Sequence, residues 1–411
     1  MTRHFFELTL LAALGLSSLY SKAIGLAWVL LILAGTWEWV QNHRGLRPNA
    51  SETLLKAWLW ITLAALLAKT IPMVYWTDPW GERHGELRLF LGALALYALA
   101  RWQGLKREAL SSIAYALSIS SAAGLIWVVM YGRENLSTHP IPWAGSIAMT
   151  SAVLLALSLK TDFAVKHRRI WFTGGLLAVM AVLSSQSRGA FGIVLWWIVV
   201  CVHHFVAKRK YAKTTPPITG QAFTRRALIV IAWLVGLALM SQSPVFQRPL
   251  ESIRQASHEI SVSQQSVEKG ANSSVGARIY LWQQSWTAIQ MSPWIGYGHD
   301  GRKEKLAEWA EMSGSTTIKH LGHVHNEYLN QLLDHGLPGL LSQMFYIVGL
   351  VGLSWKLHKH HQTASALAVA GICFVHMSCS MSNVNFAHNQ YTTSLSVLIS
   401  ISLWMSTLRP R

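Results

Sequence analysis

Residues 320–336, HLGHVHNEYLNQLLDHG, gather titratable side chains in one polar segment of a largely apolar chain. His325 directly precedes Asn326, which is a favourable N-cap for a helix over residues 327–335, and Gly336 is a favourable end for that helix. The positive end of the helix dipole disfavours a charged imidazole, so His325 should stay neutral near pH 7 and able to accept a proton. The pattern therefore predicts a general base at His325. The alternative is a histidine that only caps or packs.

Two arginines could supply positive charge beside this base. Arg188 lies in SSQSRGAFG between two apolar runs, and Arg278 opens the amphipathic segment VGARIYLWQ. A charge at the membrane surface is costly unless it is paired or functional, and the planar guanidinium can donate two hydrogen bonds to one phosphate group. Each arginine taken alone is equally compatible with an interfacial or ion-paired structural role. Lys69 and Arg88 are further candidates with the same ambiguity.

Metal and dinucleotide chemistry find little support in the sequence. The pair His323 and His325 has no further ligand nearby that would complete a metal site. The GYGHDG of residues 296–301 matches a dinucleotide motif only formally, because no strands flank it, and it is interpreted as turns between two helices. Cysteines occur only inside apolar runs and are expected to pack in the core: Cys201, Cys373 and Cys379. No metal and no cofactor are therefore predicted.

Composition identifies the elements that must position these residues. The 411-residue chain is 52% hydrophobic and only 13% charged, with 20 tryptophans, and long apolar runs are typical of membrane spans. Twelve runs are predicted as spans: 5–20, 22–40, 54–75, 87–101, 109–131, 141–159, 169–185, 190–206, 226–242, 337–355, 363–381 and 391–408. The predicted fold is an all-α polytopic membrane protein of about twelve transmembrane helices, GT-C-like, with a large periplasmic helical loop between spans 9 and 10.

Charge placement predicts the orientation in the membrane. With the N-terminus inside, the inner loops hold most of the lysines and arginines, whereas the outer loops hold few beyond Lys22, Arg83, Arg88, Arg133 and Arg188. The net charge of +17 is thus a signal of topology and of contact with anionic lipid, not of nucleic-acid binding. The first run could instead be a cleaved signal peptide, which would leave the downstream orientation unchanged.

The chain accordingly divides into a transmembrane bundle (1–242), a periplasmic catalytic loop (243–336) and a second transmembrane part (337–411). Within the loop, apolar residues at helical spacing predict a membrane- or bundle-facing helix that ends at Ser292-Pro293; they are Ile279, Trp282, Trp286 and Ile289. Residues 302–312 predict a solvated helix with Leu306 and Trp309 turned inward.

The motifs SRGA, GARIYLWQQSW, SPWIGYGHD and HVHNEYLNQLLDHGLPGLL, together with the hydropathy profile, resemble those of the O-antigen ligases. These enzymes belong to a superfamily with the O-antigen polymerases and the bacterial O-oligosaccharyltransferases. The resemblance extends over the whole chain in topology and over roughly residues 184–340 in local sequence.

The resemblance implies a glycosyltransferase of the Gram-negative inner membrane that acts at its periplasmic side. Such an enzyme moves O-antigen polysaccharide from undecaprenyl pyrophosphate to a sugar of the lipid A–core, without a metal ion and with inversion at the anomeric carbon. Arg188 and Arg278 match the arginines that bind the donor pyrophosphate, and His325 matches the proposed base. Further substrate contacts are predicted for Asn326, Tyr328, Trp282, Lys69 and Arg88.

Several alternatives stay open. An O-antigen polymerase would extend the glycan, a transporter or flippase of envelope glycolipids would move it without chemistry, and a scaffold would only assemble other proteins. The chain stops soon after its last predicted span, which is less expected of a protein O-oligosaccharyltransferase. His388 and Asn389 could line the acceptor path, whereas His376 is interpreted as a hydrogen-bond partner between helices.

Overall fold

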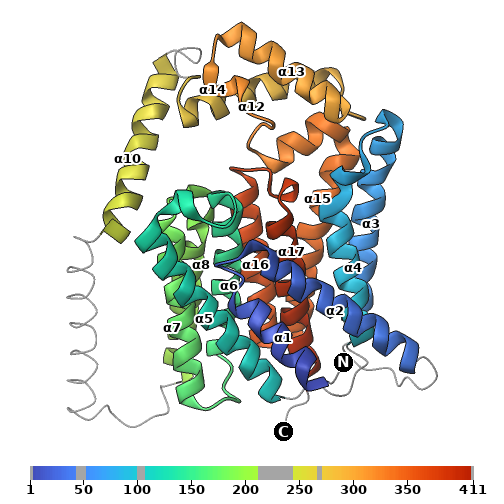
Figure 1. Cartoon of the computed structure of the whole chain (residues 1–411), viewed down its shortest axis with the longest axis vertical. Coiled ribbons are helices and arrows are strands. Elements are labelled where there is room, and N and C mark those ends of the chain that lie inside the picture. The colour runs from blue at the N-terminus through green and yellow to red at the C-terminus, as the bar shows by residue number, and fades with distance from the viewer. Residues whose placement is uncertain (1–2, 43–51, 100–106, 212–243, 266–270, 409–411) are drawn as a thin grey trace.

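The computed structural model describes residues 3–42, 52–99, 107–211, 244–265 and 271–408, and every longer regular element in these ranges is helical. A bundle of helices carries a second group of helices at one end (Figure 1). The bundle contains α1 (Arg3–Gly15), α2 (Ser21–Asn42), α3 (Glu52–Trp76), α4 (His84–Leu99), α5 (Arg107–Tyr131), α6 (Pro140–Ser158), α7 (Val165–Ser184), α8 (Gly192–Tyr211), α15 (Glu327–Lys359), α16 (Thr363–Ser380) and α17 (Asn389–Trp404). Above it lie α10 (Pro244–Gln265), α12 (Ser274–Met291), α13 (Gly298–Ser313) and α14 (Thr316–Lys319).

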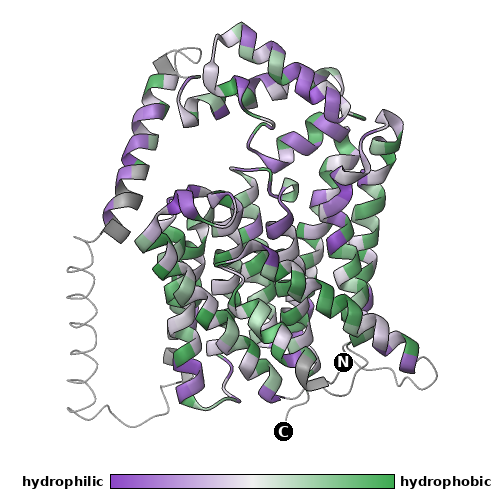
Figure 2. Ribbon diagram, viewed as in Figure 1, coloured by the Kyte–Doolittle hydropathy of each residue, from purple (hydrophilic) through white to green (hydrophobic). Residues whose placement is uncertain are grey.

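Six described helices are long and apolar enough to cross a membrane, which confirms an all-α membrane protein: α2, α3, α5, α6, α15 and α16. Every predicted span overlaps a helix except residues 226–242, which lie outside the described residues. The total of twelve spans and the side on which each loop lies stay predictions. Apolar residues dominate the bundle, and polar residues are frequent in α10, α12 and α13 (Figure 2).

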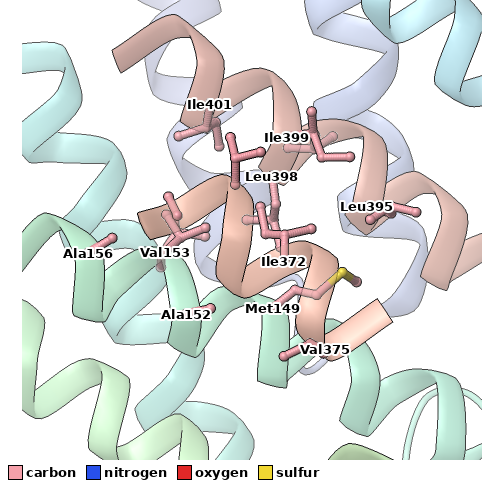
Figure 3. Packing of buried hydrophobic residues seen from close by; sticks show 14 of the residues in the cluster. Met149, Ala152, Val153, Ala156, Ile372, Val375, Leu395, Leu398, Ile399 and Ile401 are labelled. Carbon is pink, nitrogen blue, oxygen red and sulfur yellow. The ribbon is translucent and has the colours of Figure 1, made fainter. Parts of the chain in front are cut away.

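The core of the bundle lies where α6 meets α16 and α17 (Figure 3). Met149, Ile372 and Leu398 are each 1% exposed or less. Small residues allow the helices to approach closely, as is usual between membrane helices: a Cβ on Gly145 would lie 2.6 Å from Cε2 of Tyr391. Cys373 and Cys379 are buried as predicted, but Cys201 is exposed because α8 lies at the periphery, so a core role for Cys201 was wrong.

A second apolar core joins α12, α13, α14 and the first half of α15. The predicted helices are confirmed here, with α12 ending at Met291 and with Leu306 and Trp309 of α13 each 4% exposed. The face of α12 predicted to lie on the membrane or on the bundle is partly covered by protein, because Ile289 is 5% exposed and Trp286 is 55% exposed. The buried face also contains the small residues Gly276, Ala277 and Ala288, which let the neighbouring helices pack close.

The helix predicted to stop at Gly336 is interrupted there but continues. Gly336 has φ 59° and ψ −150° inside α15, and Pro338 follows two residues later. A side chain at Gly336 would overlap the backbone at Trp294, so only glycine fits this kink without rearrangement. The kink directs the first turns of α15 toward α12 and α13. Contacts of these two helices with Leu333 and Asp334 then fix the start of α15.

Candidate active site

Loops and helix ends that are far apart in sequence meet at one end of the bundle. The Ser187 hydroxyl, between α7 and α8, donates to the Pro140 carbonyl at 3.1 Å. Ser378 at the end of α16 donates to the Gly189 carbonyl at 2.8 Å, and the Asn326 amide donates to the Met381 carbonyl at 3.4 Å. These contacts bring the segments that carry Arg188 and His325 to the same end of the bundle.

Arg188 is held by a tightly seated turn. It opens a 3-10 turn, Arg188–Phe191, two residues after Gln186, which adopts a left-handed φ of 57°. A methyl group on Gly189 would overlap the Ser382 hydroxyl, so this turn presses directly against the connection between α16 and α17. Close backbone packing therefore fixes the main chain at Arg188.

Arg278 lies in the first turns of α12, whose N-terminus is capped by the Ser273 hydroxyl, which accepts from the Gly276 N–H at 3.0 Å. Burial and the positive charge of Arg188 lower the pKa of Arg278, while Glu259 acts in the opposite direction. The two predicted arginines thus lie within electrostatic range of each other. Two neighbouring guanidinium groups repel each other, and a bound anion would relieve that repulsion.

His325 is strained, partly buried and poorly hydrogen-bonded. Its φ is 54°, and its Nδ1 atom is buried without a hydrogen-bond partner. Burial lowers the pKa of His325 far below its ordinary value, and the nearby charges of His323 and Arg278 lower it further, against a contact from Asn383. Burial thus favours the neutral imidazole that the sequence predicts, and it is the largest cause of the lowered pKa of His325.

Asn326 and Tyr328 connect elements of the protein. The Asn326 side chain caps α15 by accepting from the N–H groups of Tyr328 at 3.0 Å and Leu329 at 3.1 Å, as predicted. The Tyr328 hydroxyl reaches the Met377 carbonyl at 3.5 Å. Both side chains thus join the start of α15 to the end of α16, and a substrate contact for either stays a prediction.

Three further histidine side chains lie in a row that begins at His325. The ring centroids of His323 and His325 lie 4.4 Å apart, those of His323 and His388 lie 6.4 Å apart, and the rings of His388 and His139 stack at 5.9 Å. Burial, with smaller effects of neighbouring positive charge, lowers the pKa of His323 and of His388 to about 4 each. In the described residues, no three His, Cys, Asp or Glu side chains are placed to hold a metal ion.

His139 was missed by the sequence analysis, although it caps α6 directly before Pro140 by accepting from the Ile141 N–H at 3.4 Å. A polar residue before a proline at a helix start was the available signal. His376 Nδ1 and the Tyr391 hydroxyl form a 3.0 Å hydrogen bond, which confirms the predicted role of His376 between helices.

The other predicted substrate contacts are engaged inside the protein. Lys69 is 4% exposed and forms a 3.1 Å ion pair with Glu86, which is fully buried. The Arg88 guanidinium donates to the His84 carbonyl at 3.3 Å. The Trp282 indole N–H donates to the Val324 carbonyl at 2.9 Å, so its polar edge points to the backbone of the histidine loop.

A buried polar network that the sequence analysis missed supports the site from above. Asp78, after α3, accepts from the His299 N–H at 2.9 Å and bonds His335 Nε2 at 2.8 Å. Burial alone raises the pKa of Asp78, but these two hydrogen bonds hold it below its ordinary value. Arg302 of α13 forms a 2.6 Å ion pair with Asp334 of α15. The network fixes α13 and α15 against the end of α3.

Comparison with known proteins supports the resemblance seen in the motifs. Residues 173–344 match the family model described as O-Antigen ligase. An uncharacterized protein of Haemophilus influenzae is 26% identical over 60% of this chain and 59% of its own. A general O-oligosaccharyltransferase of Acinetobacter baylyi is 27% identical over 62% of this chain and 43% of its own. An O-antigen ligase of Escherichia coli is 20% identical over 65% of this chain and 61% of its own.

The chain thus spans about half the length of the curated relatives it matches, between 43% and 61%. The matched segment of residues 173–344 contains Arg188, Arg278 and His325, and the predicted resemblance is confirmed over that segment.

Proposed function

Because residues 173–344 match the O-antigen ligase family, we propose that the chain is a glycosyltransferase that attaches O-antigen polysaccharide to lipid A–core. The donor is the polysaccharide on undecaprenyl pyrophosphate, and the reaction takes place at the periplasmic face of the inner membrane. The observation that supports this proposal is that Arg278 lies within electrostatic range of both Arg188 and the largely buried His325.

Each residue has a distinct role in the proposed reaction. Arg188 and Arg278 donate hydrogen bonds to the pyrophosphate and stabilise the negative charge that grows on it as the glycosidic C–O bond breaks. His325 takes the proton of the acceptor hydroxyl as its oxygen forms the new bond to the anomeric carbon. The pyrophosphate leaves from the opposite face, so the anomeric configuration inverts. Two guanidinium groups provide the positive charge, and the mechanism invokes no metal ion.

Donor binding would also adjust the base. In the free protein the positive charge of Arg278 is among the causes that lower the pKa of His325. A pyrophosphate beside the arginines would offset that charge and raise the pKa of His325 toward the range in which a general base is effective. The base would then become stronger only when the donor is present, which disfavours unproductive proton transfer.

A general O-oligosaccharyltransferase is the second candidate function. It is favoured by the Acinetobacter baylyi relative, which carries that name and is as similar in sequence as the other relatives. Such an enzyme would use the same kind of donor and the same three residues, but its acceptor would be a protein hydroxyl. The two functions therefore differ in the acceptor and not in the chemistry at His325.

Electrophoresis of lipopolysaccharide and of glycoproteins from a deletion strain separates these functions. Loss of a ligase should leave bare core together with accumulated carrier-linked polymer, and the wild-type gene should restore the ladder. Loss of a polymerase would leave core that bears a single repeat. Unchanged lipopolysaccharide with loss of a glycosylated protein band would contradict the ligase and support the oligosaccharyltransferase.

The orientation of the site is tested by labelling with a membrane-impermeant thiol reagent. With Cys201 replaced by alanine, the exposed positions Asn272 and His360 lie at opposite ends of the fold. In intact spheroplasts, Asn272→Cys should be labelled and His360→Cys should not. The reverse pattern would contradict a periplasmic site.

A further inference from the structure

The loop that carries His325 needs support from outside itself. His325 holds a φ of 54°, a left-handed conformation that is unfavourable for a residue with a side chain. Such a conformation persists only where surrounding contacts fix it. Residues 320–326 form no helix, and within the loop the His325 N–H reaches only His323 Nδ1, at 3.3 Å.

The first outside support comes from α13. Nη1 of Arg302 donates to the Gly322 carbonyl, three residues before His325. The same guanidinium donates through Nε to Asp334 at 2.6 Å and through Nη2 to His299 at 2.9 Å. Arg302 is 5% exposed, so each of its three nitrogens has a separate partner in a buried setting. A lysine has a single nitrogen and could not make these three contacts at once.

The second support comes from α12. The Trp282 indole N–H donates to the Val324 carbonyl at 2.9 Å, and the Val324 side chain is fully buried. Trp282 follows Arg278 by four residues, about one helical turn, so both lie on the same side of α12. The helix that carries the pyrophosphate-binding arginine thus also holds the backbone next to the base.

We propose that Arg302 and Trp282 are positioning residues for glycan transfer, which hold the Gly322 and Val324 carbonyls so that His325 keeps its strained conformation toward Arg188 and Arg278. The inference rests on the proposed function. Neither side chain exchanges a proton with substrate. Their effect is on the geometry of His325, and a displacement of a reacting group by about 1 Å costs on the order of 10²-fold in rate.

Conservative variants with neighbouring controls test this inference in the full-length protein in nanodiscs. Trp282→Phe keeps an aromatic ring and removes the indole donor, and its control is Trp286→Phe, one turn further along α12, where the side chain is 55% exposed. Arg302→Lys keeps a charge beside Asp334 and removes the Gly322 contact, and its control is Lys303→Arg, whose side chain is 58% exposed.

Two measurements apply to each variant: kcat and donor KM for transfer, and the rate at which diethyl pyrocarbonate modifies His325, followed by mass spectrometry. We expect both test variants to lower kcat by roughly 10–100-fold with little change in donor KM. His325 should be modified faster, and the controls should match wild type. The modification rate needs no enzymatic activity, so it tests the loop even if the proposed function fails.

Wild-type kcat and an unchanged modification rate in both test variants would overturn the inference. A parallel loss of kcat, donor binding and thermal stability would overturn it as well, because that result would mean a role in folding alone. Absence of transfer by the wild-type protein would contradict the proposed function. In that case, faster modification of His325 in the test variants would still show that Arg302 and Trp282 hold the loop in place.

Discussion

The core of the bundle and the candidate site differ in the hydrogen bonds that their buried polar groups form. In the bundle, many buried hydroxyls donate to their own helix, as Ser146 does to Pro142 at 2.9 Å and Ser402 to Leu398 at 2.7 Å. A few link neighbouring helices, as Ser151 does by donating to the Gly175 carbonyl at 2.8 Å. At the site, buried polar groups link distant parts of the chain, as in the Arg302–Asp334 ion pair and the Asp78–His335 bond. Left-handed φ values at non-glycine residues also occur there, at Gln186 and His325.

The difference shows which parts of the molecule the fold needs and which parts the chemistry needs. Apolar packing dominates the core of the bundle, and such packing tolerates many sequences of similar volume. The strained backbone at Gln186 and His325 costs stability, and a protein keeps such features where function requires them. Substitutions at the site should therefore affect rate, and substitutions in the core should affect stability.

The largest loss of transfer rate is expected from substitutions of the two site arginines. Arg188→Lys and Arg278→Lys keep a positive charge but lose the planar fork, so the transfer rate should fall on the order of 10²–10³-fold with normal protein levels. The matched control is Arg254→Lys on the exposed side of α10, which should transfer normally. Wild-type rates in both arginine variants would remove these residues from the site.

Substitutions in the core of the bundle should instead lower stability and leave the transfer rate of the folded protein unchanged. Gly145→Ala places a methyl group 2.6 Å from Cε2 of Tyr391 in the bundle, and it should lower the free energy of unfolding by about 1–3 kcal/mol. Gly25→Ala in α2 is the control, because its methyl group meets no atom within 4 Å. Unfolding in a detergent titration measures both. A rate defect in folded Gly145→Ala protein without lost stability would contradict the separation of core and site.

A smaller effect is expected in the dependence of rate on pH. The base must be neutral, and burial lowers the pKa of His325. We therefore expect kcat/KM to stay constant as pH falls through the ordinary histidine pKa of about 6.5. Activity should be lost only when pH falls through the lowered pKa. Bound pyrophosphate raises that pKa, so the acid limb of kcat should lie at higher pH than that of kcat/KM. An acid limb of kcat/KM at or above the ordinary value would contradict a buried neutral base.

Local patterns predicted the elements well, because each depends on neighbouring residues. The Asn326 cap, the end of α12 before Ser292 and the inward side chains of Leu306 and Trp309 all follow from short-range rules. They also identified Arg188, Arg278 and His325 as candidates, and the structure places Arg278 within electrostatic range of each of the other two. The roles of the three residues stay predictions.

Long-range contacts explain what the sequence analysis missed. Nothing near Arg302 indicates that its partner is Asp334, 32 residues away, and nothing near Asp78 indicates His335, 257 residues away. Lys69 looked available for substrate because the facing Glu86 lies on another helix.

The most direct test of the central claim is transfer by purified protein from an undecaprenyl-pyrophosphate-linked glycan to lipid A–core, compared between wild type, His325→Ala and the exposed control His320→Ala. Loss of a general base costs on the order of 10²–10⁴-fold, so His325→Ala should lose transfer while it still binds the carrier lipid. His320→Ala should behave as wild type, and a chelator should change neither. Transfer by His325→Ala at the wild-type rate would leave the histidine as a structural residue and contradict the account.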